Sequence, residues 1–241
     1  MRPGYVCLAV LASLVLLAGC ESTKSKSARL ELEGEDLVKT EKVDIGAANK
    51  QIEIVDKTVL TDVNGSAVAV VMKNGSQGGL ADAKISVDVK DGKGRSVYRN
   101  DQSGVETSLI QVPVIAAGGE VIWVNDQVIP TGKPKSVDVT VGEAKQLPNE
   151  LPEIKVSEPE IKTDPTSGIE AVGTVTNKSD IEQIDIVLYA IARKGGKIVA
   201  AGRGQIANLK TDGKPASYHI FFIGNPTGAD VTVVAPPVTL E

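Results

Sequence analysis

The chain has little of the side-chain chemistry from which most catalytic and metal sites are built. Among its 241 residues are two cysteines, one histidine and only 3% aromatic residues. Because the single histidine is His219, a His-rich metal site is excluded, and a Ser–His catalytic pair would have to use this residue. We therefore expect a protein that is not an enzyme and that has no catalytic residues, no metal site and no cofactor.

Basic residues are also in short supply. Lys and Arg total 26 against 31 for Asp and Glu, which gives a formal net charge of −5. A general nucleic-acid binder needs a basic face that neutralises phosphates. The net charge has the wrong sign for such a protein, so we expect no nucleic-acid partner.

The N-terminus carries a short apolar run, Val6–Leu17, which is preceded by the basic residue Arg2. The run is shorter than the ~20 residues of a membrane-spanning helix, and it has the pattern of a secretory signal. It ends in Leu17-Ala18-Gly19-Cys20, which resembles the bacterial lipobox. The resemblance implies cleavage between Gly19 and Cys20 and a diacylglycerol anchor, with its fatty acids such as palmitate, on Cys20. It also implies a lipoprotein of the cell envelope, held on the extracytoplasmic face of the cell membrane.

The alternative is an ordinary signal peptide that is cut near Ala18 or Gly19 and leaves Cys20 free. If Cys20 is lipidated, the mature chain has no thiol, because Cys7 leaves with the signal. A disulfide, a Cys nucleophile and a thiolate metal site are then all excluded. We expect a signal peptide over residues 1–19 and a flexible tether over residues 20–50, whose charged, small-residue composition gives it a reach of roughly 30 Å.

Alternation of apolar and polar residues begins near Gln51. Ile85, Val87 and Val89 alternate with polar residues, which is the pattern of a strand with one wet face. The following Asp91–Gly94 predicts a hairpin turn. Seven short β-rich runs with turn signals about every ten residues indicate a β-sandwich over residues 51–142. The later strands of this half are expected at Arg95–Arg99, Thr107–Ile115, Glu120–Val128 and Lys135–Val141.

A polar segment with two prolines, residues 143–152, predicts a linker, and the alternation then restarts over residues 153–241. The expected fold class is all-β, with two tandem immunoglobulin-like β-sandwiches after the signal and tether. Strands of the second half are expected at Glu153–Lys162, Ile169–Thr176, Gln183–Arg193, Lys197–Arg203, Gln205–Leu209, Ser217–Ile223 and Asp230–Val234.

The two halves share short segments in the same order, with a spacing that drifts from 102–103 residues down to 92. This favours an internal duplication with loops of different length; two unrelated sandwiches with similar turns are the alternative. The paired segments are Lys73–Ser76 with Thr176–Ser179, Ile85–Val89 with Val187–Ile191, Gly94–Val97 with Gly196–Val199, and Asp138–Val141 with Asp230–Val233.

The second half resembles the FxLYD domain over about 70 residues. The resemblance is carried by Gly173–Ser179, by Ile186-Val187-Leu188-Tyr189-Ala190 and by Gly195–Val199. It departs from the family where Ile186 replaces Phe and Ala190 replaces Asp. The resemblance implies an immunoglobulin-like sandwich in an exported or membrane-anchored protein, and it brings no catalytic residues.

Two aromatic-rich strands call for an assignment of their faces. In Tyr218–Phe222, alternation puts Tyr218, Ile220 and Phe222 inward and His219 outward; the opposite phase would bury His219. Trp123 shares a face with Val121, which favours a core ring over a ligand-stacking ring.

The long apolar run from Ile184 to Ile191 predicts a central strand covered on both faces. One face carries Val187, Tyr189 and Ile191. We expect Tyr189 to be structural and to pack in a core. Only one face of such a strand can line the core of its own sandwich, so the neighbouring domain, a loop or a partner must cover the other.

Three segments combine oxygen ligands with glycine, and three fit the glycosylation sequon. None has the alternating acidic spacing of a calcium loop, and Asx and Gly in turns explain all of them. The carboxylate-rich segments are Asp62–Gly65, Asp88–Gly92 and Asn100–Gly104, and the sequons begin at Asn64, Asn74 and Asn177.

The sequence thus predicts a non-catalytic, lipid-anchored binding or interaction module that contacts an envelope protein or polymer. The alternative is a structural or assembly subunit, a spacer within an envelope complex. An extracytoplasmic enzyme or a solute-binding lipoprotein is less compatible with the chain, which lacks catalytic signatures and a run of amphipathic helices.

Overall fold

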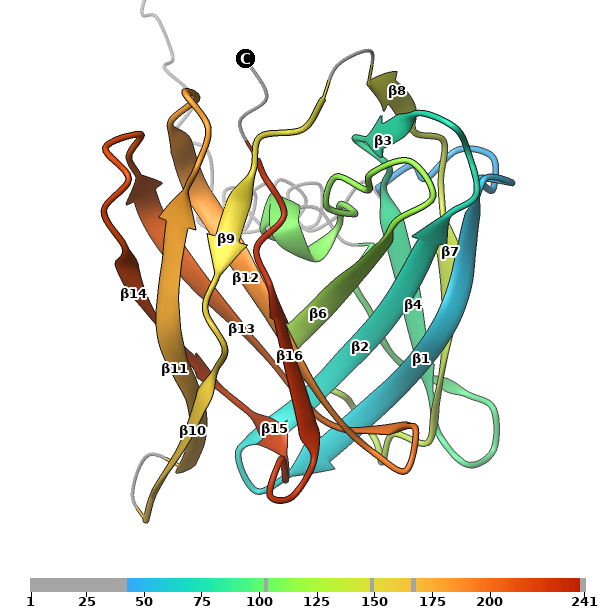
Figure 1. Cartoon of the computed structure of the whole chain (residues 1–241). Coiled ribbons are helices and arrows are strands. Elements are labelled where there is room, and N and C mark those ends of the chain that lie inside the picture. Colours follow the sequence, from blue (N-terminus) through green and yellow to red (C-terminus); the bar gives the residue numbers. More distant parts are fainter. Residues whose placement is uncertain (1–42, 102–103, 148–149, 166–167, 239–241) are drawn as a thin grey trace, which may run out of the picture. The chain divides into compact units, whose positions relative to one another are not determined.

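The computed structural model describes residues 43–101, 104–147, 150–165 and 168–238, all within the compact unit Glu41–Glu241 (Figure 1). The expected signal peptide, the lipobox with Gly19 and Cys20, and most of the tether lie outside the described residues. Among the residues described, no helix is long and apolar enough to cross a membrane.

The first half forms a β-sandwich of two antiparallel sheets. One sheet has the order β1-β2-β6 and the other the order β5-β4-β7. A separate strand pair, β3 with β8, lies beside them. The elements are β1 (Ile52–Asp62), β2 (Gly65–Asn74), β3 (Gly79–Ala81), β4 (Ile85–Lys90), β5 (Ser96–Arg99), the 3-10 turn η1 (Thr107–Leu109), β6 (Glu120–Val128), β7 (Ser136–Val141) and β8 (Lys145–Leu147).

The second half repeats this plan. One sheet has the order β10-β11-β14, with β9 also paired to β11, and the other has the order β15-β13-β12-β16. The elements are β9 (Ile154–Val156), β10 (Glu160–Asp164), β11 (Gly168–Asn177), β12 (Gln183–Lys194), β13 (Lys197–Leu209), β14 (Ala216–Phe221), β15 (Ile223–Gly224) and β16 (Asp230–Val234).

Matched strands occupy matched places in the two sandwiches. The sheet β1-β2-β6 corresponds to β10-β11-β14, and β5-β4-β7 corresponds to β13-β12-β16. In both halves the chain crosses from one sheet to the other and back, as in immunoglobulin-like sandwiches. The paired segments of the sequence fall on corresponding strands. Their register differs in one case, because Asp138 lies opposite Asp88 whereas Asp230 lies opposite Arg193.

The clearest shared detail is a buried asparagine at the end of β2 and of β11. Asn74 Oδ1 accepts hydrogen bonds from the backbone N–H and hydroxyl of Ser76, at 2.8 and 2.7 Å. Asn177 Oδ1 accepts the same two bonds from Ser179, at 2.9 and 2.7 Å. Each amide nitrogen also donates to the carbonyl four residues ahead. Both halves therefore close this turn with the same local structure, which supports duplication.

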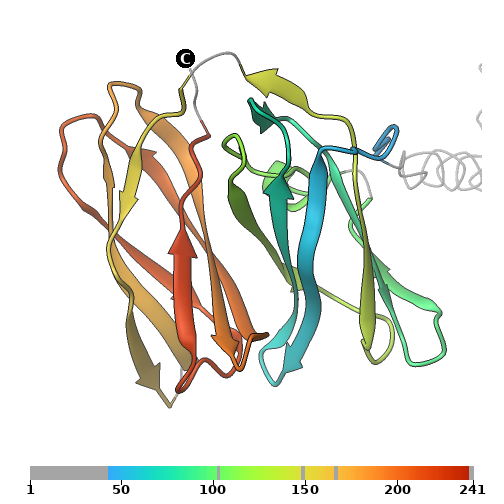
Figure 2. The ribbon, with the colours of Figure 1, turned by 45° about the vertical axis from the view of Figure 1, so that its right-hand side comes forward.

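The two sandwiches stack face to face, so that the described chain forms four layers of sheet (Figure 2). From one outer layer to the other, the order is β5-β4-β7, β1-β2-β6, β15-β13-β12-β16 and β10-β11-β14. The strands β6, β2 and β1 contact β12, β13 and β15 across the middle. We call this contact between the second and third layers the seam.

Most predicted strands are confirmed, and Glu120–Val128 and Asp230–Val234 match β6 and β16 residue for residue. The predicted strand Thr107–Ile115 is wrong. This segment contains η1 and only two isolated bridges, at Gln111 and Ile115. Pro113 lies between them, and its missing N–H prevents a continuous ladder. The predicted linker 143–152 includes the short strand β8.

The assignments of the aromatic strands are confirmed. Trp123 is fully buried, and its indole N–H donates to the carbonyl of Ser108 at 2.9 Å. Tyr218 is buried opposite Gly173, where an added Cβ would come within 2.5 Å of the Tyr218 hydroxyl. A glycine is therefore required beneath this ring. His219 is exposed on the other face.

Candidate binding cleft between the two sandwiches

Strand β12 is buried on both faces, as its unbroken apolar run predicts. Ile186, Leu188 and Ala190 lie in the core of the second sandwich. Val187, Tyr189 and Ile191 join the apolar cluster of the first sandwich instead. Tyr189 is therefore structural and 3% exposed, as expected, but it packs in the seam and not inside its own sandwich.

Small and branched side chains of the first sandwich cover the opposite side of the seam. On β6, alternation turns Ile122 and Val124 away from Trp123 and toward the second sandwich. Their cross-strand partners on β2 are Val71 and Ala69. All four are buried. The seam therefore has the apolar packing of a protein interior, and it holds the two sandwiches as one block.

A buried arginine ties one end of the seam together. Arg203 on β13 donates to both carboxylate oxygens of Glu106, at 3.1 Å each, and to the hydroxyl of Ser108. Its Nε lies 3.3 Å from Asp126 Oδ1, on β6. The Arg203 side chain is only 10% exposed. Because the guanidinium bonds Glu106 through two nitrogens, its orientation is fixed as well as its charge paired, and Arg203 links the two sandwiches at this end.

The two carboxylates around Arg203 respond to burial in opposite ways. Burial opposes ionisation of Glu106, but the hydrogen bonds from Arg203 and Ser108 outweigh it and hold the pKa of Glu106 below its ordinary value. Burial dominates at Asp126 and raises the pKa of that carboxyl despite Arg203. The Arg203 guanidinium therefore pairs with one carboxyl whose ionisation is favoured, Glu106, and with one whose ionisation is disfavoured, Asp126.

Further polar contacts tie the other end of the seam. Arg193 on β12 lies 2.6 Å from Asp56 on β1. Asp62 Oδ2, at the end of β1, accepts the N–H of Gly224 on β15 at 2.8 Å. Both contacts join residues more than 130 positions apart in the sequence. No local sequence pattern could have paired them.

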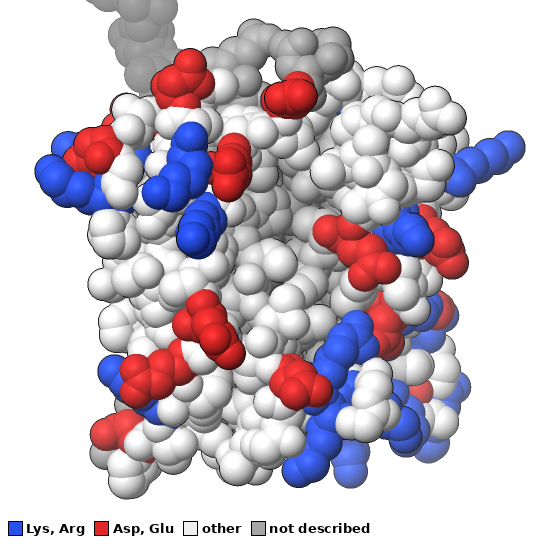
Figure 3. Space-filling view, viewed as in Figure 1, with Lys and Arg blue, Asp and Glu red and all other residues white. Residues whose placement is uncertain are grey.

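Beyond the Arg203 end, the seam opens into a cleft of about 430 Å³. Apolar side chains make most of its wall, and the surface is visibly hollowed between the two halves (Figure 3). This volume lies in the usual range for a ligand pocket, roughly 300–1,000 Å³. The first sandwich contributes Asp82, Glu106 and Val112–Val114 among others, and the second contributes Ile184, Asp185, Val187, Tyr189, Gln205 and Pro236–Val238.

Two aspartates in this wall have the same unusual backbone. Asp82 has φ +59° and Asp185 has φ +52°, and they are the described non-glycine residues with positive φ. They are 103 positions apart, like Asn74 and Asn177. Asp82 lies three residues before β4, and Asp185 is the third residue of β12. Aspartate tolerates the left-handed region better than most residues, and the two matching bends place one carboxylate from each half at the cleft.

The carboxylates of the cleft differ in their partners. Asp82 Oδ2 lies 2.9 Å from Lys145 Nζ, and its Oδ1 accepts a hydrogen bond from Gln111. Glu106 is held by Arg203. Of the residues that the structure describes, no Lys or Arg lines the cleft itself. The arrangement suits an apolar group with a hydrogen-bond donor or a positive charge at its edge.

The residues that the sequence singled out for chemistry lie elsewhere. His219 Nδ1 is 2.9 Å from Glu170 Oε2 on the outer face of the second sandwich. Asp62 and Asp91 each accept a backbone N–H from two residues ahead, as expected of Asx turns. Asn100 does not serve a local turn: it is buried, and its side chain bonds the backbone of Ile85, Val87 and Leu109. Within the described ranges, no group of three or more His, Cys, Asp and Glu is placed to hold a metal ion.

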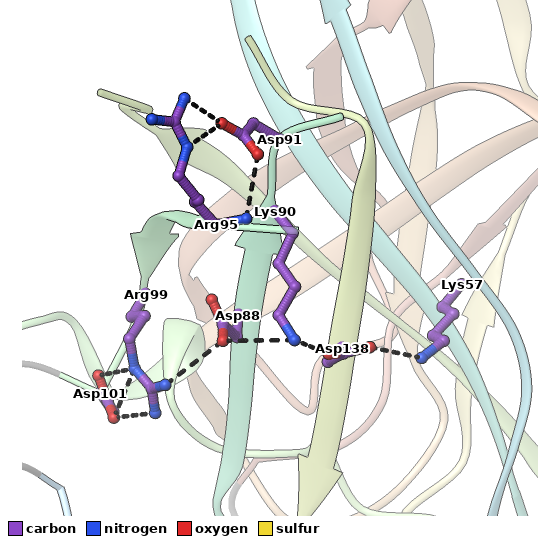
Figure 4. A network of polar contacts seen from close by, with 8 residues as sticks. All are labelled: Lys57, Asp88, Lys90, Asp91, Arg95, Arg99, Asp101 and Asp138. Atoms are coloured by element: carbon purple, nitrogen blue, oxygen red, sulfur yellow. Dashed lines mark hydrogen bonds and ion pairs between the residues drawn. The ribbon is translucent and has the colours of Figure 1, made fainter. Parts of the chain in front are cut away.

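The outer sheet of the first sandwich carries a network of ion pairs (Figure 4). Asp88 lies between Arg99, at 3.5 Å, and Lys90, at 4.0 Å. Lys90 also pairs with Asp138 on β7, which reaches Lys57 on β1 at 3.9 Å. Most of these side chains are partly exposed, so each pair adds at most about 1 kcal/mol. The network balances charge on this sheet.

Sequence reasoning alone missed the cleft, because its walls come from distant segments. The signals that could have pointed to it are the Asp near the start of the central strand in each half, Asp82 and Asp185, and the unbroken apolar run Ile186–Ile191. Comparison of the chain with protein-family models and with curated proteins finds no match.

Proposed function

We propose that the protein is a non-catalytic, lipid-anchored binding module on the extracytoplasmic face of the membrane. Its contact site is the cleft at the end of the seam. The lipobox at Leu17–Cys20 supports the anchor, and the likeness of the second half to FxLYD domains supports an exported interaction module. The observation that carries the proposal is an apolar cleft of about 430 Å³ whose two walls come from different sandwiches.

The chemistry of the cleft favours a segment of an envelope protein over a highly charged polymer. Its wall is mainly apolar, and its acidic groups belong to Asp82, Glu106 and Asp185. An anionic polymer would be repelled by these carboxylates, and the neighbouring cations Lys145 and Arg203 are already paired with Asp82 and Glu106. A peptide that inserts an apolar side chain, flanked by N–H donors or a basic residue, would satisfy both features.

The stacking of the sandwiches favours a binding module over a spacer. Tandem domains gain length when they join end to end, whereas here they lie face to face (Figure 2). The stacking also fixes the two walls of the cleft. A preformed cleft lowers the ordering cost of binding.

Site-specific photocrosslinking in cells tests the cleft. A photoreactive phenylalanine analogue at Val114 or Val238, which line the two walls, should give one discrete adduct. The same analogue at Phe221, half exposed on the far sheet, is the matched control and should give none. Equal adducts from all three positions, or adducts from Phe221 alone, would contradict the assignment of the cleft as the contact site.

The anchor is tested separately with Cys20→Ser. Since the lipid needs the Cys20 thiol, this variant should leave the membrane fraction or keep its signal uncut. A processed Cys20→Ser protein that still fractionates with membranes would contradict the lipid anchor, and it would leave the crosslinking result unaffected.

A further inference from the structure

Four exposed cations gather at the end of the first sandwich away from the cleft. Lys93 and Arg95 lie in the β4–β5 turn, and Lys133 and Lys135 lie in the loop between β6 and β7. The two loops border an open hollow of about 840 Å³. A group of basic residues marks the lower right of the molecule in Figure 3. This concentration stands out in a chain of net charge −5.

The carboxylate in the wall of this hollow is already committed. Asp91 Oδ1 accepts the backbone N–H groups of Lys93 and Arg95, and Oδ2 pairs with the Arg95 guanidinium (Figure 4). Among the residues that the structure describes, no carboxylate lies within ion-pair distance of Lys93, Lys133 or Lys135. These ammonium groups are therefore available to an anionic partner.

The two most exposed large aliphatic side chains of the described chain lie at the same end. Val63, at the tip of the β1–β2 turn, is fully exposed, and Ile129, directly after β6, is 83% exposed. Ser66, on the β2 side of that turn, pairs with Val128, the residue before Ile129, so the two side chains lie at the same end of this sheet. We call Val63, Lys93, Arg95, Ile129, Lys133 and Lys135 the basic end.

The combination of cations and aliphatic tips discriminates between anionic partners. A soluble anionic polymer gains from the cations but nothing from Val63 and Ile129. An anionic bilayer offers phosphates to the cations and an apolar boundary to the aliphatic side chains. We propose that the basic end docks on an anionic phospholipid surface.

This contact is distinct from the anchor proposed at Cys20. Strand β1 runs from Ile52, beside the first described residues, to Asp62 at the basic end (Figure 1). Eleven residues of strand span roughly 35 Å. The chain thus enters the block at one end, and the basic end lies at the other. It would touch either a facing membrane or, with the block lying down, the membrane that holds the anchor.

Vesicle co-sedimentation of the chain from Glu21 to Glu241 tests this proposal without the lipid. This chain keeps both apolar cores and all the contacts described above. It should bind vesicles of phosphatidylglycerol and phosphatidylcholine, and not vesicles of phosphatidylcholine alone. The binding should weaken as salt is raised.

Charge reversal identifies the surface. Because each basic residue near an anionic membrane strengthens binding by about five-fold, the double variant Lys133→Glu with Lys135→Glu should bind at least about twenty-five-fold more weakly. The double variant Lys210→Glu with Lys214→Glu changes the net charge equally, in the exposed loop between β13 and β14, and should bind like the wild type. Val63→Ser with Ile129→Ser should cost a few-fold, since each buried CH₂ adds to the affinity.

Three results would overturn the proposal, given that circular dichroism shows each variant folded. One is equal binding to neutral and anionic vesicles. Another is an equal loss in the two charge-reversed proteins, which would mean that net charge alone decides. The third is binding to inorganic polyphosphate without binding to anionic vesicles, which would assign the basic end to a soluble polyanion. Since this chain lacks Cys20, none of these results bears on the lipid anchor.

Discussion

The two sandwiches have the same strand order, but their corresponding sheets face different surroundings. In the first, the outer sheet β5-β4-β7 carries the ion-pair network of Figure 4 on its surface. In the second, the matching sheet β15-β13-β12-β16 has a surface of Val187, Tyr189 and Ile191 and is buried in the seam. Two sheets with the same strand order can therefore differ in the outward face of their central strand, and that face decides whether the sheet contacts water or a neighbouring sandwich.

Separating the two sandwiches should have the largest effect. An isolated second half would expose Val187, Tyr189 and Ile191, at about 1.5–3 kcal/mol for each large apolar side chain. That loss is comparable with the 5–15 kcal/mol of a whole domain. We expect residues 153–241 alone to aggregate or to melt far below the intact chain, which should unfold in one transition by calorimetry. Two independent transitions at the temperatures of the separate halves would contradict the seam.

The substitution Tyr189→Ala removes one large apolar side chain from the seam. Truncation of a buried aromatic ring costs about 3–5 kcal/mol. We expect a marked fall in melting temperature with loss of contact between the halves, measured by denaturant unfolding and limited proteolysis. Phe221→Ala, at a half-exposed ring, is the control and should change stability little. A Tyr189→Ala protein as stable as the Phe221→Ala protein would show that the ring does not support the fold.

The buried asparagines Asn74 and Asn177 test whether the two halves are structurally equivalent. Asn74→Ala removes the side-chain donor from three carbonyls and Asn177→Ala removes it from two. One hydrogen bond of each set is fully buried, so each change should cost about 1–3 kcal/mol. If the repeats are equivalent, the two losses of unfolding free energy should be similar. Asn64→Ala, in the exposed β1–β2 turn, is the control and should be nearly neutral. A large loss at one asparagine only would indicate that the two turns support their sandwiches unequally.

The smallest expected effect concerns the carboxylates around Arg203. Glu106 has a lowered pKa in the fold, so its stabilisation is present above its ordinary value of 4.5 and is lost as pH falls below it. Asp126 has a raised pKa, so its contribution runs the other way and favours the protonated carboxyl. Glu106→Gln should lower stability at neutral pH by at most about 1 kcal/mol, and Asp126→Asn should lower it less or raise it. Melting temperatures across pH would measure both, and the reverse order would contradict this assignment.

Much of the local structure could be predicted from alternation. Period-two patterns located β4, β6 and β16, and the phase of Tyr218–Phe222 placed His219 outside. The segment Thr107–Ile115 failed because apolar composition alone does not supply ladder partners. Its backbone instead makes isolated bridges to Leu80 on β3 and to Lys84, just before β4, on either side of Pro113. The candidate site could not be predicted, since Asp82 and Asp185 meet only through the stacking of the halves.

The sequence by itself determined the all-β class, the repeated strand order and the presence of a strand that must be covered on both faces. These features depend on local alternation and turn chemistry, which act over a few residues. Only the tertiary structure decided what covers that strand. Tyr189 and Val187 meet β2 and β6 because two apolar faces more than 60 residues apart leave water together. The cleft and the contacts of Arg203 with Glu106, Ser108 and Asp126 form only because the two sandwiches stack in this way.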